Sequence, residues 1–85
     1  MPTIEMYSSE LCPFCYRAKA LLAAKGVSVQ IHDVDSDVEL RKEMMERSGG
    51  HTVPQIFVDD ELIGGCDDLY ALERANALDT RLGLT

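Results

Sequence analysis

The hydrophobic pattern of this chain changes its period at Pro13, and this change restricts the possible folds more than any other feature. Residues 3–7 alternate apolar and polar side chains, which is typical of a strand. After Pro13, apolar residues such as Phe14, Ala18 and Leu22 recur at helical spacing. Proline suits the first helical position because its fixed φ fits a helix and its missing N–H would have no partner there. The pattern therefore predicts a strand that leads directly into a helix.

Five more elements follow the first helix, which is expected to end at Lys25-Gly26. They are a strand at residues 27–31, a helix from a capping box at Ser36–Glu39 to Gly49, two strands at residues 55–58 and 61–63, and a last helix that is capped by Asp67 or Asp68 and ends near Asn76. Two strands joined through a helix should be parallel, and the Asp59-Asp60 turn makes the later pair an antiparallel hairpin. We therefore expect an α/β fold, a four-stranded mixed sheet flanked by helices on both faces, in a single domain spanning residues 1–85.

The charge balance disfavours nucleic acid as a partner. The 85 residues include 15 acidic and 8 basic side chains, which gives a net charge of −7. Phosphate backbones are bound by clusters of Lys and Arg, whereas the nearest basic pairs here are interrupted or flanked by acids. Within the helix that follows Ser36, Glu43 and Arg47 have the i,i+4 spacing of an ion pair.

The same sequence lacks the signals of membrane insertion or export. No stretch approaches the ~20 apolar residues of a membrane span. Residues 1–5 do not combine a basic segment with a following apolar run, so no secretory signal is expected. We expect a monomer in the cytoplasm that acts without a membrane partner.

Three cysteines, Cys12, Cys15 and Cys66, are the residues with the most distinctive chemistry. An odd number of cysteines in a short chain without a signal favours reduced thiols over a disulfide framework. Cys66 is interpreted as a small buried hydrophobic residue rather than a participant in redox chemistry.

The tetrapeptide Cys12-Pro13-Phe14-Cys15 lies where the first strand gives way to the first helix. Cys12 then occupies the N-cap, where free backbone N–H groups and the helix dipole favour an anion. Cysteines in such positions have pKa values lowered from ~8.5 into the range ~3.5–7.5. Cys15 lies in the first turn and can form a disulfide with Cys12. Cys12 is thus the expected exposed attacking sulfur, and Cys15 the more buried resolving one.

A zinc site is the alternative interpretation of this motif. A structural zinc needs four ligands, and one C-x-x-C supplies two of them. His32, His51 and Cys66 could be recruited, but they lack the paired spacing of zinc modules. We therefore expect no metal.

The chain contains, in this order, the stretches Cys12-Pro-Phe-Cys15, Thr52-Val-Pro54 and Gly64-Gly-Cys-Asp-Asp68. Together they resemble the glutaredoxin family, and in particular its small bacterial dithiol members, and the resemblance extends over nearly the whole chain. It implies a thioredoxin fold with Pro54 in cis and its loop facing the Cys12 sulfur. Without the resemblance, Pro54 could simply begin an edge strand.

The resemblance also implies a glutathione site. The main chain of Val53 would pair with the cysteinyl unit, and N–H groups at the start of the last helix would receive the γ-glutamyl carboxylate. The Asp67 side chain could bind the α-amino group, although Asp67 and Asp68 could also be simple caps. The full set of expected glutathione-binding residues is Cys12, Phe14, Thr52, Val53, Pro54, Gly65, Cys66, Asp67 and Asp68.

Two positions depart from the family pattern. Most relatives have Tyr where this chain has Phe14, and many have Lys where it has Ser9. The lysine helps to hold a thiolate or the glycyl carboxylate of glutathione. Arg41, Lys42 and Gln55 are the candidates to replace its contact with that carboxylate.

The implied activity is glutathione-dependent reduction of protein disulfides and of protein–glutathione mixed disulfides. Glutathione would be the reducing co-substrate, and ribonucleotide reductase is an expected protein partner. One alternative is a redoxin that receives electrons from thioredoxin reductase. Another is an iron–sulfur carrier, in which two chains share a cluster through Cys12 and two glutathiones, although Pro13 should stiffen the loop against that geometry.

Overall fold

The structure is a computed structural model that describes residues 2–85, in which four strands and four helices are present. In chain order they are β1 (Ile4–Ser8), α1 (Pro13–Ala24), β2 (Gln30–Asp33), α2 (Val38–Ser48), β3 (Gln55–Val58), β4 (Glu61–Gly64), α3 (Cys66–Arg74) and α4 (Leu78–Arg81). Among these helices, none has the length and apolar character needed to cross a bilayer.

The four strands form one sheet with the order β2-β1-β3-β4. β1 is parallel to β2 and antiparallel to β3, and β3 and β4 form an antiparallel hairpin. Both turn residues of the hairpin have positive φ, 49° at Asp59 and 69° at Asp60, as two-residue hairpin turns of type I′ require. The predicted mixed sheet is therefore confirmed.

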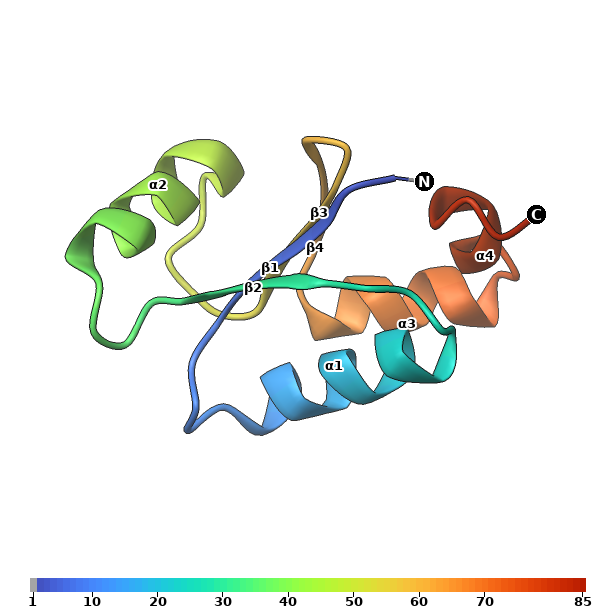
Figure 1. Cartoon of the computed structure of the whole chain (residues 1–85), viewed down its shortest axis with the longest axis horizontal. Coiled ribbons are helices and arrows are strands. Elements are labelled where there is room, and N and C mark those ends of the chain that lie inside the picture. Colours follow the sequence, from blue (N-terminus) through green and yellow to red (C-terminus); the bar gives the residue numbers. More distant parts are fainter. Residues whose placement is uncertain (1) are drawn as a thin grey trace.

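Helices cover both faces of the sheet, as predicted. α1 and α3 lie side by side on one face, and α2 lies on the other (Figure 1). Neighbouring residues of β1 serve the two faces, because successive side chains of a strand point in opposite directions. Met6 packs into the core with α1 and α3, whereas Tyr7 packs with Met44 of α2.

Several predicted boundaries are wrong at the level of single residues. β2 begins at Gln30 rather than at residue 27, and Val27 and Val29 belong to the connection before it, where they pack against the α1–α3 core. The cap of α2 is Asp37, not Ser36: its Oδ1 accepts hydrogen bonds from the backbone N–H of Glu39 at 3.0 Å and of Leu40 at 3.1 Å.

Candidate active site

Cys12 occupies the N-cap of α1, as predicted from the sequence. Its backbone is extended, with φ −119° and ψ 104°, and its sulfur accepts a hydrogen bond from the backbone N–H of Cys15 at 3.1 Å. The same sulfur lies 3.7 Å from the carbonyl oxygen of Val53. The first turn of α1 therefore places the Cys12 sulfur directly against the loop that contains Pro54.

The two cysteines of the motif differ in their surroundings. Cys12 is 9% exposed and Cys15 is fully buried, so the order of accessibility is as predicted. The prediction of an exposed Cys12 is nevertheless wrong in degree, because the Val53 loop and the first turn of α1 cover most of this residue. Burial, followed by the hydrogen bond with Cys12, raises the pKa of the Cys15 thiol, while the charge of Lys19 has a smaller opposite effect. Cys15 is consequently a protonated thiol at neutral pH.

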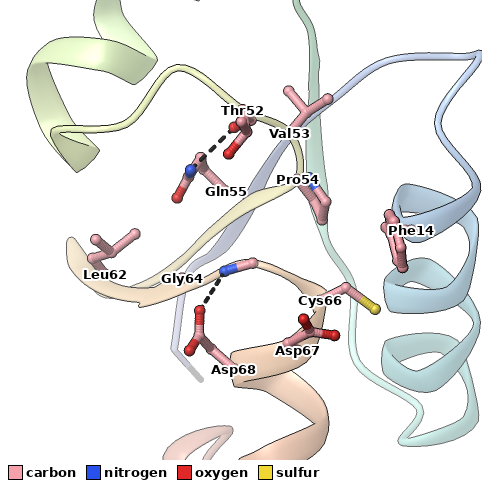
Figure 2. Close-up of a pocket in the computed structure, with 11 residues that line it drawn as sticks. Phe14, Thr52, Val53, Pro54, Gln55, Leu62, Gly64, Cys66, Asp67 and Asp68 are labelled. Atoms are coloured by element: carbon pink, nitrogen blue, oxygen red, sulfur yellow. Dashed lines mark hydrogen bonds between the residues drawn. The ribbon is translucent and has the colours of Figure 1, made fainter.

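A groove of about 560 Å³ lies beside this pair. Figure 2 shows its walls: Phe14 of α1 on one side, the loop before β3 on another, and the start of α3 below. Its lining residues are Phe14, Thr52, Val53, Pro54, Gln55, Leu62, Gly64, Gly65, Cys66, Asp67 and Asp68. Cys12 is not one of them, but borders the groove through its contact with Val53. The structure thus brings the other eight predicted binding residues together in one groove.

The loop wall of the groove is fixed by Gln55. The Val53–Pro54 peptide bond is cis, as the family resemblance implied. The Gln55 side chain is nearly buried, and its Nε2 donates a hydrogen bond to the carbonyl oxygen of Thr52 at 3.0 Å (Figure 2). Gly50 gives this amide its space, since a Cβ at that position would lie 3.1 Å from Nε2. Gln55 therefore stabilises the backbone conformation of residues 52–55.

The opposite wall is the start of α3, where the predicted cap is wrong. The N-cap is Gly65, and Asp68 sits three residues later with its Oδ2 accepting the Gly65 N–H at 3.0 Å (Figure 2). Gly64 permits this arrangement: its φ is +118°, and a Cβ there would collide with the Asp68 carboxylate. The first backbone N–H groups of α3 consequently face the groove without helical partners.

Cys66 and Arg17 lie at the α1 side of the groove. Cys66 is buried, and this burial raises the pKa of its thiol, opposed by the charge of Arg17. The Arg17 guanidinium lies over the ring of Tyr70 at 5.3 Å and over the ring of Phe14 at 6.0 Å. Burial supports the interpretation of Cys66 as a small hydrophobic residue.

The candidates for replacing the missing lysine are separated by the structure. Gln55 lines the groove, whereas Arg41 and Lys42 do not. Arg41 instead points at the carbonyl oxygen of His51, at 3.5 Å. Ser9, which stands where many relatives have lysine, hydrogen-bonds Asp35 and lowers the pKa of that carboxyl group.

Leu62 and Gly64 line the groove but were not predicted as site residues. Leu62 belongs to the edge strand β4 and is 42% exposed. Its apolar side chain alone does not mark it as a site residue, because the alternation of apolar and polar residues in a short strand does not show which face of the strand borders a groove. Gly64 belongs to the stretch Gly64–Asp68, but its role follows from the close approach of the Asp68 carboxylate, which only the structure shows.

The fold and this site define a thioredoxin-fold redox protein with a cysteine pair at a helix N-terminus. The glutaredoxin family model matches residues 4–63, and the chain belongs to the glutaredoxin family. It is 55% identical to "Glutaredoxin 3" of Escherichia coli K12 over 82 residues, which cover 96% of this chain and 99% of that protein. It is 49% identical to a glutaredoxin of Pseudomonas aeruginosa over 96% of this chain and 98% of the relative.

Solved structures agree with this assignment. The solution structure of a Brucella melitensis glutaredoxin superposes with a TM-score of 0.86 at 50% identity, covering 99% of this chain and 91% of that one. The crystal structure of a buckwheat glutaredoxin–glutathione complex superposes with a TM-score of 0.88 at 26% identity, covering 96% of this chain and 77% of that one. The family establishes the chain as a thiol–disulfide oxidoreductase.

Proposed function

We propose that this chain reduces disulfides with glutathione as its reductant, in the cytoplasm. One observation carries the proposal: the Cys12 sulfur lies 3.7 Å from the Val53 carbonyl oxygen, at the edge of a groove whose other end is a helix N-terminus. A tripeptide with a thiol in its middle and carboxylates at its ends has the chemistry to fill such a groove. The structurally similar buckwheat glutaredoxin is described in complex with glutathione, which supports the same ligand here.

Each part of glutathione has a partner of matching chemistry in the groove. The exposed backbone of Val53 pairs with the cysteinyl unit, as an added strand pairs with a sheet edge. The N–H groups of Cys66, Asp67 and Asp68 receive the γ-glutamyl carboxylate, since helix N-termini attract anions. The Asp67 carboxylate accepts hydrogen bonds from the α-amino group. The half-exposed Phe14 ring covers the ligand from the α1 side. The Gln55 side-chain amide lines the groove and is the proposed hydrogen-bond partner of the glycyl carboxylate.

In the first reaction, a protein–glutathione mixed disulfide is reduced. The Cys12 thiolate attacks the glutathione sulfur, so that a new Cys12–glutathione disulfide forms and the protein sulfur leaves as a thiolate that takes up a proton. A second glutathione thiolate then attacks the sulfur of the bound glutathione. Oxidised glutathione leaves, and Cys12 returns as a thiolate.

In the second reaction, a protein disulfide is reduced and Cys15 takes part. Cys12 attacks one sulfur of the substrate and forms a mixed disulfide with it, while the other sulfur leaves and is protonated. Cys15 then loses its proton and attacks Cys12, which releases the second substrate thiol and leaves a Cys12–Cys15 disulfide. Two glutathiones reduce that disulfide and depart as oxidised glutathione. Ribonucleotide reductase is one protein whose disulfide we propose as a substrate.

The test is a coupled assay with hydroxyethyl disulfide, glutathione and glutathione reductase, run in parallel with thioredoxin reductase as the electron source. Cys12→Ser should abolish turnover, because the attacking sulfur is gone. Cys15→Ser should retain deglutathionylation and lose the reduction of protein disulfides. Activity with thioredoxin reductase alone would refute glutathione as the reductant, and activity of Cys12→Ser would refute the assigned roles.

A further inference from the structure

The surface beside the Cys12 sulfur carries two large apolar side chains that the glutathione groove does not use. Leu11 is 93% exposed and Tyr16 is 60% exposed. Neither lines the groove. They occupy the positions just before the N-cap and four residues after it, where apolar residues commonly pack on each other as a hydrophobic staple. An exposure of 93% shows that Leu11 makes no such contact, and the pair is left open to solvent.

One basic side chain, Lys19, extends this surface along α1. The Lys19 ammonium lies 5.6 Å from the centre of the Tyr16 ring, one helical turn away. Arg17 and Lys19 are the charged residues of α1, and no acidic residue lies within Pro13–Ala24. On the other side of Leu11, Glu10 is exposed and acidic. Lys19 is therefore the basic side chain beside Tyr16, whereas the Arg17 guanidinium lies over the rings of Phe14 and Tyr70 on the groove side of α1.

Disulfide geometry determines what must approach Leu11 during the reaction. In a mixed disulfide the Cα atoms of the two cysteines are about 4.4–6.8 Å apart. The Cα of Leu11 is only about 3.8 Å from that of Cys12, because the two residues are neighbours in the chain. The residues that flank a substrate cysteine bonded to Cys12 therefore lie within side-chain reach of Leu11 or of the groove. The β1–α1 connection that carries Leu11 lies at the lower edge of the molecule in Figure 1, and within residues 2–85 the Leu11 side chain is 93% exposed.

We propose that Leu11, Tyr16 and Lys19 form a docking surface for the protein whose disulfide is reduced. The preferred substrate segment has an apolar residue beside its reactive cysteine and acidic residues on the side that faces α1. The inference rests on the proposed function in one respect, namely that Cys12 is the attacking sulfur. It adds a preference among protein substrates, whereas the groove binds a tripeptide common to all of them.

The test uses two peptides with the same internal disulfide, and enzyme that is reduced beforehand and freed of reductant. Leu and two Glu flank the first cysteine in one peptide, and Ser and two Lys flank it in the other. The rate of a single turnover is measured without glutathione, so the result does not depend on the choice of reductant. Hydroxyethyl disulfide serves as a small substrate that is too short to reach the surface.

The variant Leu11→Ser/Tyr16→Ser should reduce the apolar–acidic peptide roughly tenfold more slowly, as expected when central apolar anchors of an interface are truncated. Its rate with hydroxyethyl disulfide should stay within about twofold of the parent, because docking is not part of that reaction. Val38→Ser is the matched control, since Val38 is 79% exposed at the start of α2 and far along the chain from the cysteines. It should behave like the parent with both substrates.

A charge substitution tests the second part of the proposal. Lys19→Glu should reduce the preference for the acidic peptide over the basic one by roughly threefold or more, mainly through the association rate. Arg74→Glu makes the same charge change at the far end of α3 and should leave the preference unchanged.

Three results would overturn the docking surface. Equal losses on the peptide and on hydroxyethyl disulfide would mean that the two residues position Cys12 instead of binding substrate. Unchanged rates on both would mean that the surface is not used. A parent chain that elutes as a dimer, and a double variant that elutes as a monomer, would assign the surface to a second copy. A fourth result would separate the two proposals. If the reduced enzyme reduces the peptides in a single turnover but glutathione does not regenerate it, the proposed function is refuted and the docking surface is retained.

Discussion

The two faces of the sheet are held to their helices by different forces. On the face of α1 and α3, ten buried residues form a continuous core, which includes Met6, Leu22 and Leu69. On the face of α2, the buried cluster has only four members, among them Tyr7 and Met44. Apolar burial scales with the area removed from water, so the first face contributes most of the hydrophobic stabilisation.

On the α2 face, a network of hydrogen bonds and ion pairs between polar and charged side chains adds to the small apolar cluster. Arg47 lies 4.1 Å from the centre of the Phe57 ring and donates two hydrogen bonds to the Glu5 carboxylate, each 3.1 Å long. It also donates to the Tyr7 hydroxyl at 2.7 Å, and that hydroxyl in turn donates to Glu43. α2 is therefore fastened to the sheet largely by electrostatic contacts.

This difference matters for the site because each wall of the groove depends on a different face. The Cys12 sulfur and the start of α3 belong to the apolar face. The wall formed by Thr52 and Val53 follows α2 in the chain, and Val53 packs against the buried cluster on the α2 face. Conditions that weaken charge pairs should therefore loosen the Thr52–Val53 wall before they disturb the cysteine pair.

The largest expected effect is the loss of a core side chain from the apolar face. Leu69→Ala should lower the free energy of unfolding by about 3 kcal/mol, because a fully buried leucine loses its burial and leaves a cavity. Urea unfolding measures the change. The matched substitution Leu11→Ala, at a residue 93% exposed, should cost less than about 0.5 kcal/mol. Comparable losses at both positions would contradict the assignment of the core.

Residues of the apolar face could be predicted from the sequence, because local spacing determines them. Ala18 and Leu22 recur at helical spacing after Pro13, and both are buried in this core. The polar network could not be predicted in this way. Arg47 was expected to pair with Glu43 in its own helix, but it binds Glu5, 42 residues away in the chain. Only the packing of α2 against the sheet brings β1 and α2 close enough for that contact.

The site divides in the same manner. The cysteine pair and the start of α3 are marked by short motifs whose chemistry is local. The Gln55 amide that holds Thr52 and the edge residue Leu62 depend on how the hairpin lies against the loop. No spacing rule in the sequence expresses that arrangement.

The next largest effect tests the polar face. Arg47→Met should lower the free energy of unfolding by about 2 kcal/mol, since it keeps an apolar stem on Phe57 but leaves Glu5 without its main partner. The loss is smaller than for a fully buried pair because 24% of the Arg47 side chain is exposed. Arg41→Met, in the same helix, is the control and should change stability by less than about 0.5 kcal/mol.

The pH dependence separates the two faces. The hydrogen bond with Arg47 holds the pKa of Glu5 below its ordinary value of 4.5. A lowered native pKa stabilises the protein above the unfolded value, and this contribution is lost as the pH falls through the native pKa. The difference between the parent and Arg47→Met should therefore shrink below about pH 4.5. The effect of Leu69→Ala should not change over the same range, and a parallel decrease would refute the contrast.

A smaller effect is expected from the hydroxyl group at the centre of the polar network. Tyr7→Phe retains the buried ring but removes the group between Glu43 and Arg47, which should cost about 1 kcal/mol. In the double variant Tyr7→Phe/Arg47→Met, the loss of unfolding free energy should be smaller than the sum of the two single losses, because the substitutions share one interaction. Strict additivity in a double-mutant cycle would show that the two side chains act independently.

The smallest effect concerns a polar contact on the apolar face, at the edge of the groove. Asp67 and Asp68 both lie in the first turn of α3 and both favour the positive end of its dipole, but only Asp68 is bonded to the Gly65 N–H. Asp68→Ala should therefore destabilise the protein by about 0.5 kcal/mol more than Asp67→Ala, a difference that isolates the hydrogen bond from the charge. For glutathione the order should be reversed, with Asp67→Ala raising KM more, because we assign the α-amino contact to Asp67. If Asp68→Ala raised KM more instead, the free carboxylate at the groove would be Asp68, and the position of the γ-glutamyl end would have to be reassigned.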